Sequence, residues 1–205
     1  MIQEQSVAEY LEALASGSST PGGGAAAALT LAQAAALVVM VCNFTYGKEK
    51  YADVKDQVFD IMDHAKGIQR LALRAVEDDA AAFKAVMQAY KLPGPIAGRD
   101  IRKEDAIQDA LKRAATVPWN LVECCEKLYE KALDLRPICN PNLVSDVDVA
   151  ICLLQSAIGA LWINVDVNMR QIKDPNFGLG MRAKVLGAMK RIQPLQLDPF
   201  RALFD

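Results

Sequence analysis

Apolar residues recur every three to four positions along most of the chain, which is the spacing of one face of an α-helix. Strict alternation of apolar and polar residues, the pattern of a half-buried strand, is rare. A capping box formed by Ser6 and Glu9 predicts a first helix that ends near Ser16 and Gly17. The pattern therefore predicts an all-α protein without a sheet of consequence.

Long helical stretches follow, separated by glycine and proline. The second stretch carries no charge and is rich in alanine and glycine, so that neighbouring helices can approach it on every side. Val117-Pro118 predicts a kink or a break in the fourth stretch, because proline lacks a backbone donor. The predicted helical segments cover about residues 21–46, 48–91, 102–135, 141–172 and 175 onward. Together they predict an antiparallel helical bundle with long central helices.

Four pairs of a capping residue followed by proline mark possible helix starts, because proline suits the first helical position. These pairs are Thr20-Pro21, Asn140-Pro141, Asp174-Pro175 and Asp198-Pro199.

Composition limits the class of protein. The chain has 205 residues, 52% of them hydrophobic, which suits a single domain over residues 1–205. The formal net charge of -2 makes nucleic acid a poor partner, because nothing would neutralise a phosphate backbone. A small anionic ligand remains compatible with this charge.

Five cysteines without a CxxC pair and a single histidine, His64, argue against a metal site. We interpret the cysteines as reduced packing residues of a cytoplasmic protein. The N-terminus does not read as a signal peptide. Residues 25–42 carry no charge and approach the length of a membrane span, but their alanine content favours a buried core helix. We therefore expect neither a membrane nor a metal partner.

Asp79 is the first candidate for chemistry, because it falls on the apolar line of the third helix. A carboxylate there must be desolvated, paired or functional, and burial would let it carry a proton near neutral pH. The alternative is that Asp79 lies at the edge of the apolar stripe beside the polar Glu77 and Asp78.

Polar positions on the fifth helix form a second candidate. Asp146, Asn164 and Asn168 share one face at helical spacing. The two amides, four residues apart, could match the donor and acceptor edge of a heterocycle. Alternatively, they could bond to a neighbouring helix or simply face water near the helix end.

A third candidate is the segment Thr20-Pro21-Gly22-Gly23-Gly24. Glycines at a helix start let a ligand approach unpaired amides, although they would equally allow tight helix packing. Other polar residues carry weaker signals: Lys48 is a surface charge that would suit an anionic tail, and Ser145 has no histidine base.

The ordered set of motifs resembles the formiminotransferase-cyclodeaminase C-terminal domain family, which includes stand-alone methenyltetrahydrofolate cyclohydrolases. The resemblance covers about residues 6–172 and rests on these segments in order: Ser19 to Gly24, Tyr46-Gly47-Lys48, Asp79-Ala80-Ala81-Ala82-Phe83, Val117-Pro118, Asn140, Ser145-Asp146, Asn164 and Asn168. One departure is Ala25, where relatives usually have serine after the three glycines.

The resemblance implies a helical homodimer with tetrahydrofolate sites near the subunit contact, and catalysis without a metal or redox cofactor. It implies that Asp79 is the catalytic carboxylate. It also implies that the following residues contact the substrate: Thr20, Pro21, Gly22, Gly23, Gly24, Lys48, Asn140, Ser145, Asp146, Asn164 and Asn168.

The implied reaction is hydrolysis of 5,10-methenyltetrahydrofolate to 10-formyltetrahydrofolate, with Asp79 moving the protons. Two alternatives stay open at this point. One is the cyclodeaminase reaction on 5-formiminotetrahydrofolate, which releases ammonia. The other is a catalytically silent helical dimer that binds folate or a partner protein.

Overall fold

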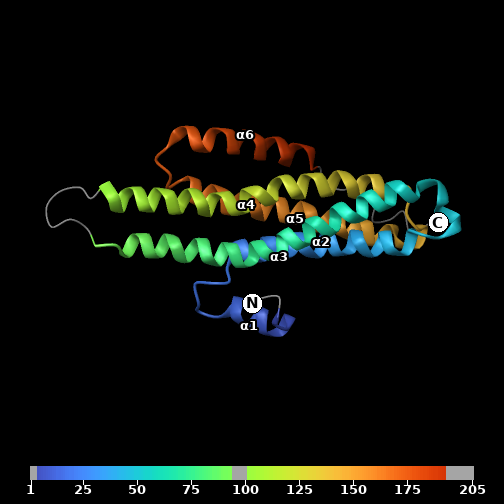
Figure 1. Cartoon of the computed structure of the whole chain (residues 1–205), viewed down its shortest axis with the longest axis horizontal. Helices are drawn as coiled ribbons and strands as arrows, with labels where there is room; N and C mark the ends of the chain where they lie inside the picture. Colours follow the sequence, from blue (N-terminus) through green and yellow to red (C-terminus); the bar gives the residue numbers. More distant parts are fainter. Residues whose placement is uncertain (1–3, 94–100, 193–205) are drawn as a thin grey trace, which may run out of the picture.

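The computed structural model describes residues 4–93 and 101–192, apart from the side chains of residues 101 and 102. This part of the chain is helical and contains no β-strand (Figure 1). Its α-helices are α1 (Val7–Ala15), α2 (Gly23–Thr45), α3 (Lys55–Lys91), α4 (Ile101–Leu135), α5 (Val144–Met169) and α6 (Pro175–Arg191). Two short 3-10 helices, η2 (Glu49–Val54) and η3 (Pro141–Leu143), precede α3 and α5. The prediction of an all-α protein is confirmed.

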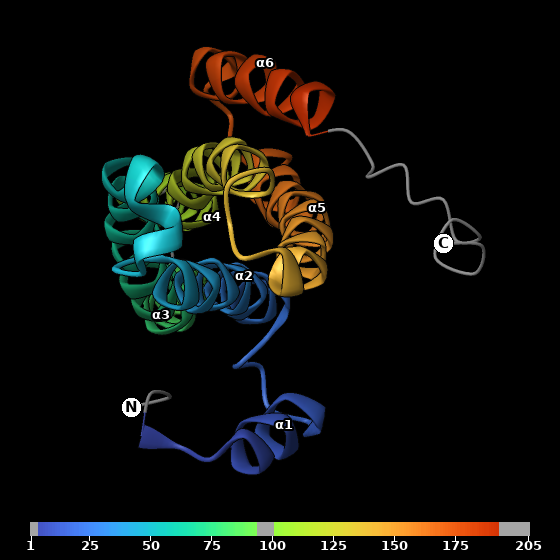
Figure 2. The ribbon, with the colours of Figure 1, turned by 90° about the vertical axis from the view of Figure 1, so that its right-hand side faces the viewer.

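Helices α2 to α5 form an antiparallel four-helix bundle in which each helix packs against the next and α5 packs against α2 (Figure 2). The two remaining helices lie outside the bundle on opposite sides, α1 beyond α2 and α6 beyond α4 (Figure 2). The predicted antiparallel bundle with long central helices is therefore confirmed.

Small side chains allow α2 to sit deep in the bundle. Ala25, Ala28, Ala34 and Ala35 are almost completely buried, together with larger residues such as Leu31. Because the distance between helix axes depends on the side chains at the contact, a row of alanines lets α3 and α5 approach closely. The absence of charge along α2 follows from the same burial.

The four bundle helices differ in length, and this difference creates a groove. Helix α2 has 23 residues, whereas α3 has 37. At 1.5 Å per residue, α3 is about 21 Å longer than α2. Beyond the first turn of α2, α3 and α4 pack through a small second core that contains Val86, Leu111 and Ala114. The space that α2 would occupy at this end of the bundle is left open.

One predicted boundary is wrong. Helix α2 begins at Gly23 with Gly22 in the N-cap position, so Thr20 and Pro21 do not start it. The physical reason is a side chain from another helix, described below, which interacts with the Ala25 amide in the first turn of α2. At Val117-Pro118 a kink or a break was expected, and α4 continues through Pro118 to Leu135, so the helix does not break there. Packing of α4 between α3 and α5 supports the turn that lacks one backbone donor.

The other capping pairs behave as predicted where the structure describes them. The Asp174 side chain caps α6 by accepting from the amides of Asn176 and Phe177. Asn140 caps the short helix η3, which leads into α5. Asp198-Pro199 lies outside the described residues.

Two stretches are long and apolar enough to cross a membrane by length and composition, namely Gly23–Thr45 and Pro141–Met169. Both pack against two neighbours in the bundle, and 56% of the apolar window in Gly23–Thr45 is buried inside it. Packing of this kind accounts for the apolar sequence of α2 as a core helix.

The buried hydroxyl of Thr45 joins the end of α2 to the segment before α5. It donates to the Val41 carbonyl at 2.8 Å and accepts from the Asn140 amide at 3.1 Å. Replacing Thr45 with valine keeps the shape but leaves the Asn140 amide without an acceptor. We expect Thr45→Val to lower the free energy of unfolding by about 1–3 kcal/mol in chemical denaturation.

Thr116→Val is the matched control, because the Thr116 hydroxyl bonds only to the Lys112 carbonyl one turn earlier in the same helix. Its effect should be clearly smaller. Equal effects of the two substitutions would mean that the link between Thr45 and Asn140 does not stabilise the fold.

Candidate active site

A pocket of about 380 Å³ occupies the open end of the bundle, where α2 begins. Its walls come from α3, α4 and α5, and the segment before α2 closes one side. The polar side chains that line it are Ser19, Thr20, Asp79, Asn164, Asn168 and Gln171. The backbone of Gly22, Gly23 and Gly24 also lines it. The structure thus brings together Asp79, the glycine segment and the two asparagines.

Asp79 caps the N-terminus of α2 from the neighbouring helix α3. Its carboxylate accepts a hydrogen bond from the amide of Ala25, which is one of the amides that an α-helix leaves unpaired at its start. This contact takes the place of a local cap by Thr20. It needs only the backbone of residue 25, so the alanine at this position does not affect it.

The acidity of Asp79 reflects two opposing effects. Burial disfavours the charged carboxylate and raises its pKa, whereas the hydrogen bond from Ala25 favours the charged form. Burial is the larger effect, and the pKa is raised from its ordinary value. A raised pKa brings the carboxyl group closer to the pH range in which it can both accept and return a proton.

Gly24 is required by the close approach of Asp79. A Cβ atom added to Gly24 would lie 2.0 Å from Oδ1 of Asp79 and 2.4 Å from its Cγ. No side chain fits there, so the glycine lets α2 reach the carboxylate. Gly23 is less constrained, since a Cβ there would be 3.6 Å from Oδ1 of Asn164.

The two asparagines line the pocket from α5. Each amide nitrogen donates one turn back along α5, Asn164 to the Ala160 carbonyl at 2.8 Å and Asn168 to the Asn164 carbonyl at 2.9 Å. These bonds fix the side chains while the amide oxygens keep their capacity to accept. Among the described residues, neither side chain forms a hydrogen bond to another helix, and neither is fully exposed to water.

An apolar wall faces these polar groups. Phe83 and Tyr90 share the helical spacing of the apolar line of α3, yet they are 39% and 44% exposed. The reason is that α2 begins at Gly23 and does not extend along this part of α3. Met87, which the sequence analysis did not single out, is 43% exposed and lines the same wall. A flat aromatic ligand could lie against this surface.

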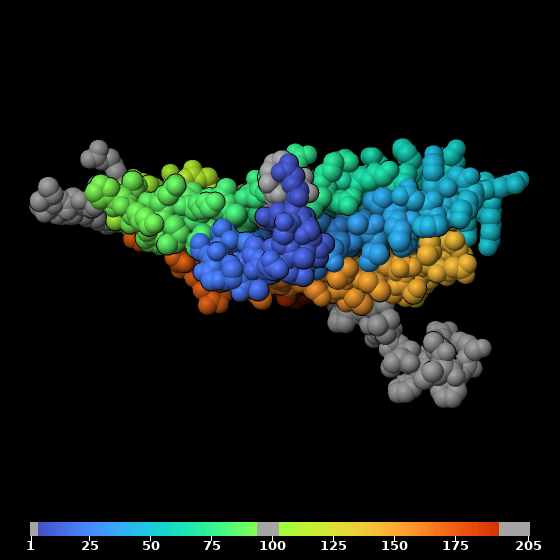
Figure 3. Space-filling model, turned by 90° about the horizontal axis from the view of Figure 1, so that it is seen from below, coloured from blue at the N-terminus to red at the C-terminus, as the bar shows by residue number. Residues whose placement is uncertain are grey.

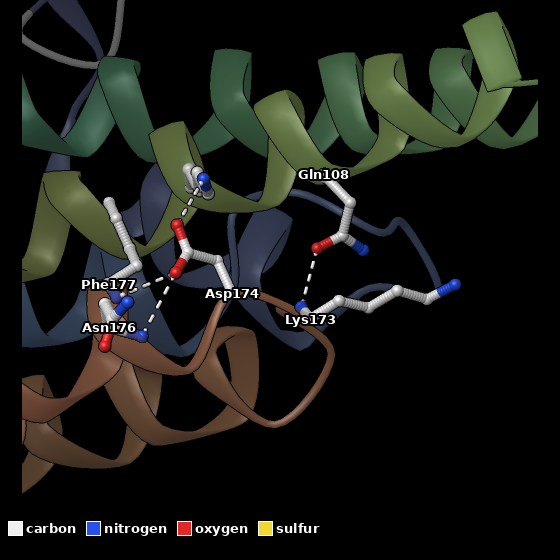
Figure 4. Close-up of polar contacts among 6 residues, drawn as sticks. Gln108, Lys173, Asp174, Asn176 and Phe177 are labelled. Atoms are coloured by element: carbon white, nitrogen blue, oxygen red, sulfur yellow. Dashed lines mark hydrogen bonds and ion pairs between the residues drawn. The ribbon is translucent and has the colours of Figure 1, made fainter.

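The far end of the pocket is held by hydrogen bonds between helices. The Tyr90 hydroxyl donates to Oε1 of Gln171 at 3.0 Å, and Nε2 of Gln108 donates to the Gln171 carbonyl at 3.1 Å. Figure 4 shows the adjoining turn, where the amide of Lys173 donates to Oε1 of Gln108 at 2.7 Å. Sequence analysis missed Gln171, because no periodic or motif signal marks it.

The same turn is tied to α4 by an ion pair. Asp174 accepts from Nζ of Lys112 at 3.0 Å and from the amides of Asn176 and Phe177 (Figure 4). These bonds fix where α5 ends and α6 begins, and so they hold the end of the pocket wall.

Tyr10 is a second residue near Asp79 that sequence analysis missed. It extends from α1 and is only 5% exposed, and no described group lies within hydrogen-bond reach of its hydroxyl. Burial raises the pKa of this phenol, and the negative charge of Asp79 raises it further. The apolar stripe of the first helix was its only signal in the sequence.

Four other predicted substrate contacts lie elsewhere in the chain. Lys48, Asn140, Ser145 and Asp146 are at the opposite end of the bundle, where α2 ends and α5 begins. Thr45 follows Gly24 by 21 positions in α2, which places this end about 31 Å from Gly24 and the adjacent Asp79, at 1.5 Å per residue. Within one chain these residues do not join the pocket, and their substrate role stays a prediction.

The charged groups, possible metal ligands and thiols of the described residues limit the kinds of reaction that the pocket can support. Asp79 is the one charged side chain among the described residues that line it. Among residues 4–93 and 101–192, no three His, Cys, Asp or Glu side chains gather where they could hold a metal ion. Burial raises the pKa of the Cys42 thiol to about 12, so this cysteine is a packing residue and not a nucleophile. Proton transfer by Asp79 is the chemistry that the lining residues support.

The fold and the pocket define a class: a four-helix bundle with a carboxyl group of raised pKa between an aromatic wall and an amide wall. The chain belongs to the formiminotransferase-cyclodeaminase family, whose model matches residues 6–186.

Relatives include enzymes of folate metabolism. Methenyltetrahydrofolate cyclohydrolase from Methylorubrum extorquens is 36% identical over 177 residues, which are 86% of this chain and 85% of that protein. Formimidoyltransferase-cyclodeaminase from Mus musculus is 30% identical over 176 residues, but the chain spans only 32% of its length. The crystal structure of formiminotetrahydrofolate cyclodeaminase from Thermotoga maritima superposes with a TM-score of 0.82 at 30% identity, covering 94% of this chain and 96% of that one.

The contact between Gly24 and Asp79 predicts a strong effect of one methyl group. In Gly24→Ala the added Cβ would displace the carboxylate from the Ala25 amide. We expect the Gly24→Ala variant to unfold at a lower temperature and to lose most of the activity that depends on the pocket. Gly67→Ala in α3 is the control, because a Cβ there meets nothing within 4 Å. The control should be neutral or stabilising by about 0.5–1 kcal/mol, since alanine favours the helix.

Equal unfolding temperatures for Gly24→Ala and Gly67→Ala would show that α2 or Asp79 can shift without a loss of stability. The close packing described for Gly24 would then not constrain the protein.

The raised pKa of Asp79 predicts how stability depends on pH. Its pKa is above 3.8 in the folded protein, so the folded state holds the proton more tightly than the unfolded state. The stability contributed by the protonated carboxyl group is complete below pH 3.8 and is lost as pH rises through the higher folded-state value.

Asp79→Asn removes this dependence and leaves no cation unpaired, since no described lysine or arginine forms an ion pair with Asp79. We expect the variant to be at least as stable as the wild type at pH 7, with the difference shrinking toward pH 4. Urea unfolding at several pH values would measure this. A variant that is much less stable at pH 7 would contradict the burial argument.

Proposed function

We propose that this protein is an enzyme of one-carbon metabolism that hydrolyses 5,10-methenyltetrahydrofolate to 10-formyltetrahydrofolate. The observation that carries the proposal is Asp79, a half-buried carboxyl group with a raised pKa at the base of a pocket of suitable size. Similarity to the cyclohydrolase of Methylorubrum extorquens over most of both chains supports the same reaction.

The two sides of the pocket suit the two parts of the substrate. Amide oxygens of Asn164 and Asn168 can accept from the nitrogens of the reduced pteridine ring. The aromatic wall formed by Phe83 and Tyr90 suits the aminobenzoyl ring, which has a flat apolar face. Gly22 to Gly24 let the ring system come close to the start of α2.

The reaction needs a proton acceptor and then a proton donor at one place. Water adds to the electrophilic carbon that bridges N5 and N10 of the substrate, and its proton passes to the Asp79 carboxylate. The adduct then opens as the bond between this carbon and N5 breaks and Asp79 returns the proton to N5. The hydroxyl of the adduct releases its proton to solvent as the C=O bond forms, which leaves the formyl group on N10. Partial burial of Asp79 suits both steps, because it brings the pKa of the carboxyl group closer to the operating pH.

The cyclodeaminase reaction remains the second candidate. It is favoured by the superposition with the cyclodeaminase from Thermotoga maritima over nearly the whole of both chains. In that reaction N10 attacks the formimino carbon and ammonia leaves, so the same carboxyl group would take the proton from N10 and give a proton to the departing amino nitrogen. The mouse relative is about three times longer than this chain, and a formiminotransferase activity is not part of the proposal.

The direct test follows the near-ultraviolet band of 5,10-methenyltetrahydrofolate, whose loss should be faster with the protein than without it. A parallel incubation with 5-formiminotetrahydrofolate, assayed for released ammonia, tests the second candidate. Neither loss of the band nor release of ammonia above the uncatalysed rates would leave a binding protein and refute both enzymatic proposals.

Asp79→Asn tests the role of the carboxyl group. The amide keeps the shape but cannot carry the proton, so we expect kcat to fall about 10²–10⁴-fold while KM changes far less. Asp78→Asn is the control, because Asp78 is exposed on the adjacent position of α3. Near wild-type turnover by a folded Asp79→Asn variant would remove Asp79 from the mechanism.

We also propose that the enzyme acts in the cytoplasm, as a homodimer and without a metal or redox cofactor. Support for the dimer comes from two long stretches without charge, residues 21–46 and 149–165, whose outward positions stay partly exposed in one chain. Sedimentation equilibrium at micromolar concentration should give twice the mass of one chain. A stable monomer under those conditions would contradict the proposal.

A further inference from the structure

Helix α1 covers the start of α2 from outside the bundle. Seen from below, α1 lies across the region where α2 begins beside α3 (Figure 3). In Figure 1 it lies at the same level along the bundle as the first turns of α2. Asp79 is at this level too, because its Oδ1 would be 2.0 Å from a Cβ atom on Gly24. Helix α1 therefore lies on the outer side of the region in which the Asp79 carboxyl group approaches α2.

Tyr10 is the buried residue of α1. Its side chain is only 5% exposed, whereas Val7 and Leu11 on the same helix are 76% and 54% exposed. Tyr10 is therefore the residue through which α1 packs most closely on the bundle.

The hydroxyl group of Tyr10 is buried without a described hydrogen-bond partner. A buried hydroxyl usually forms a hydrogen bond, because losing its contacts with water costs free energy. Phenylalanine would fill the same space without this cost. Packing of α1 thus explains the ring of Tyr10 but not its hydroxyl, and the position of the hydroxyl favours a role in the chemistry of the site.

The Tyr10 hydroxyl is close enough to Asp79 for the two groups to interact electrostatically. The negative charge of Asp79 raises the pKa of the phenol, in addition to the larger effect of burial. The phenol therefore stays protonated at neutral pH and keeps a proton to donate. One water molecule between the hydroxyl and the carboxylate would complete a hydrogen-bonded contact. The unpaired amides at the start of α2 offer this water further partners.

Few other charged groups surround this contact. Helix α2 has no charged side chain, and the pocket residues of α4 and α5 have none either. On α1, Glu9 belongs to the capping box and Glu12 is exposed. On α3, Asp78 is exposed and Glu77 is partly buried. All of these groups stay in place when the phenol hydroxyl is removed, so the pKa of Asp79 reports on that hydroxyl.

We propose that Tyr10 is a positioning residue of the active site: its hydroxyl donates, through one water molecule, to the Asp79 carboxylate and stabilises the charged form that accepts the proton. This inference rests on the proposed function for the reaction that Asp79 serves. The contact between Tyr10 and Asp79 can be measured without a substrate.

The first test measures the pKa of Asp79 in the free protein, from the carbon-13 NMR shifts of the aspartate carboxyl groups as pH changes. Asp79→Asn identifies the signal of Asp79. Tyr10→Phe keeps the ring and removes the hydroxyl, so the pKa of Asp79 should rise by about one pH unit, because a donor to the charged form is lost. An unchanged pKa would overturn the proposal, whether or not the protein turns over folate.

Tyr129→Phe is the matched control, because Tyr129 is also a buried tyrosine. It lies about 22 Å further along α4 than the pocket residue Ala114, at 1.5 Å per residue. Removing its hydroxyl should leave the pKa of Asp79 unchanged. A similar rise in both variants would be a general consequence of altered packing and would overturn the role of Tyr10.

The second test follows kcat/KM for 5,10-methenyltetrahydrofolate as pH changes. The acid limb of this profile reports the group that must be ionised, so Tyr10→Phe should move the limb to higher pH. Below both midpoints kcat/KM of the variant should be about tenfold lower than that of the wild type, and well above them the two values should agree. A uniform loss at every pH would indicate a structural role and overturn the proposal.

Thermal unfolding separates damage to the fold from an effect on Asp79. We expect Tyr10→Phe to unfold at no lower temperature than the wild type, because phenylalanine fills the same space and removes a buried polar group. A much lower unfolding temperature with an unchanged pKa of Asp79 would make Tyr10 a structural residue. Absence of turnover by the wild type refutes the proposed function instead, and the NMR measurement still decides whether Tyr10 acts on Asp79.

Discussion

The contact between the Asp79 carboxylate and the Ala25 amide in the first turn of α2 sets the geometry of the rest of the molecule. It determines where α2 begins, because the amide of Ala25 is satisfied by a side chain of α3 and not by a local cap. It requires glycine at position 24, because no Cβ fits beside the carboxylate. It also holds the carboxyl group in the pocket at the open end of the bundle.

The pocket exists because the four bundle helices are unequal. Starting α2 at Gly23 leaves the last turns of α3 without a fourth neighbour, and Phe83 and Tyr90 remain exposed there. Exposed aromatic rings are normally a cost in a folded domain. Here they form a wall against which a flat ligand can lie, so one difference in helix length supplies both the cavity and its apolar surface.

Burial and helix capping act in opposite directions on Asp79, and this balance suits proton transfer. A fully buried carboxyl group would stay protonated, while a fully exposed one beside the start of a helix would stay ionised. Half-burial against Gly24 gives a raised pKa without removing the hydrogen bond from Ala25. Tyr10 adds a second buried polar group to this region, and its hydroxyl has no described partner.

The sequence alone determined the all-α class and the long helices, because helical spacing and capping residues are local signals that extend over many turns. It also singled out Asp79 as a candidate, because a carboxylate on the apolar line of a helix departs from the pattern. It also paired Asn164 with Asn168, since residues four apart on a helix must share a face. Only the tertiary structure decided that α2 starts at Gly23, because its cap comes from α3, 54 residues further along the chain by the numbering. It likewise separated Lys48, Asn140, Ser145 and Asp146 from the pocket, because the distance between the ends of a bundle depends on how helices align and not on the residues that the ends contain.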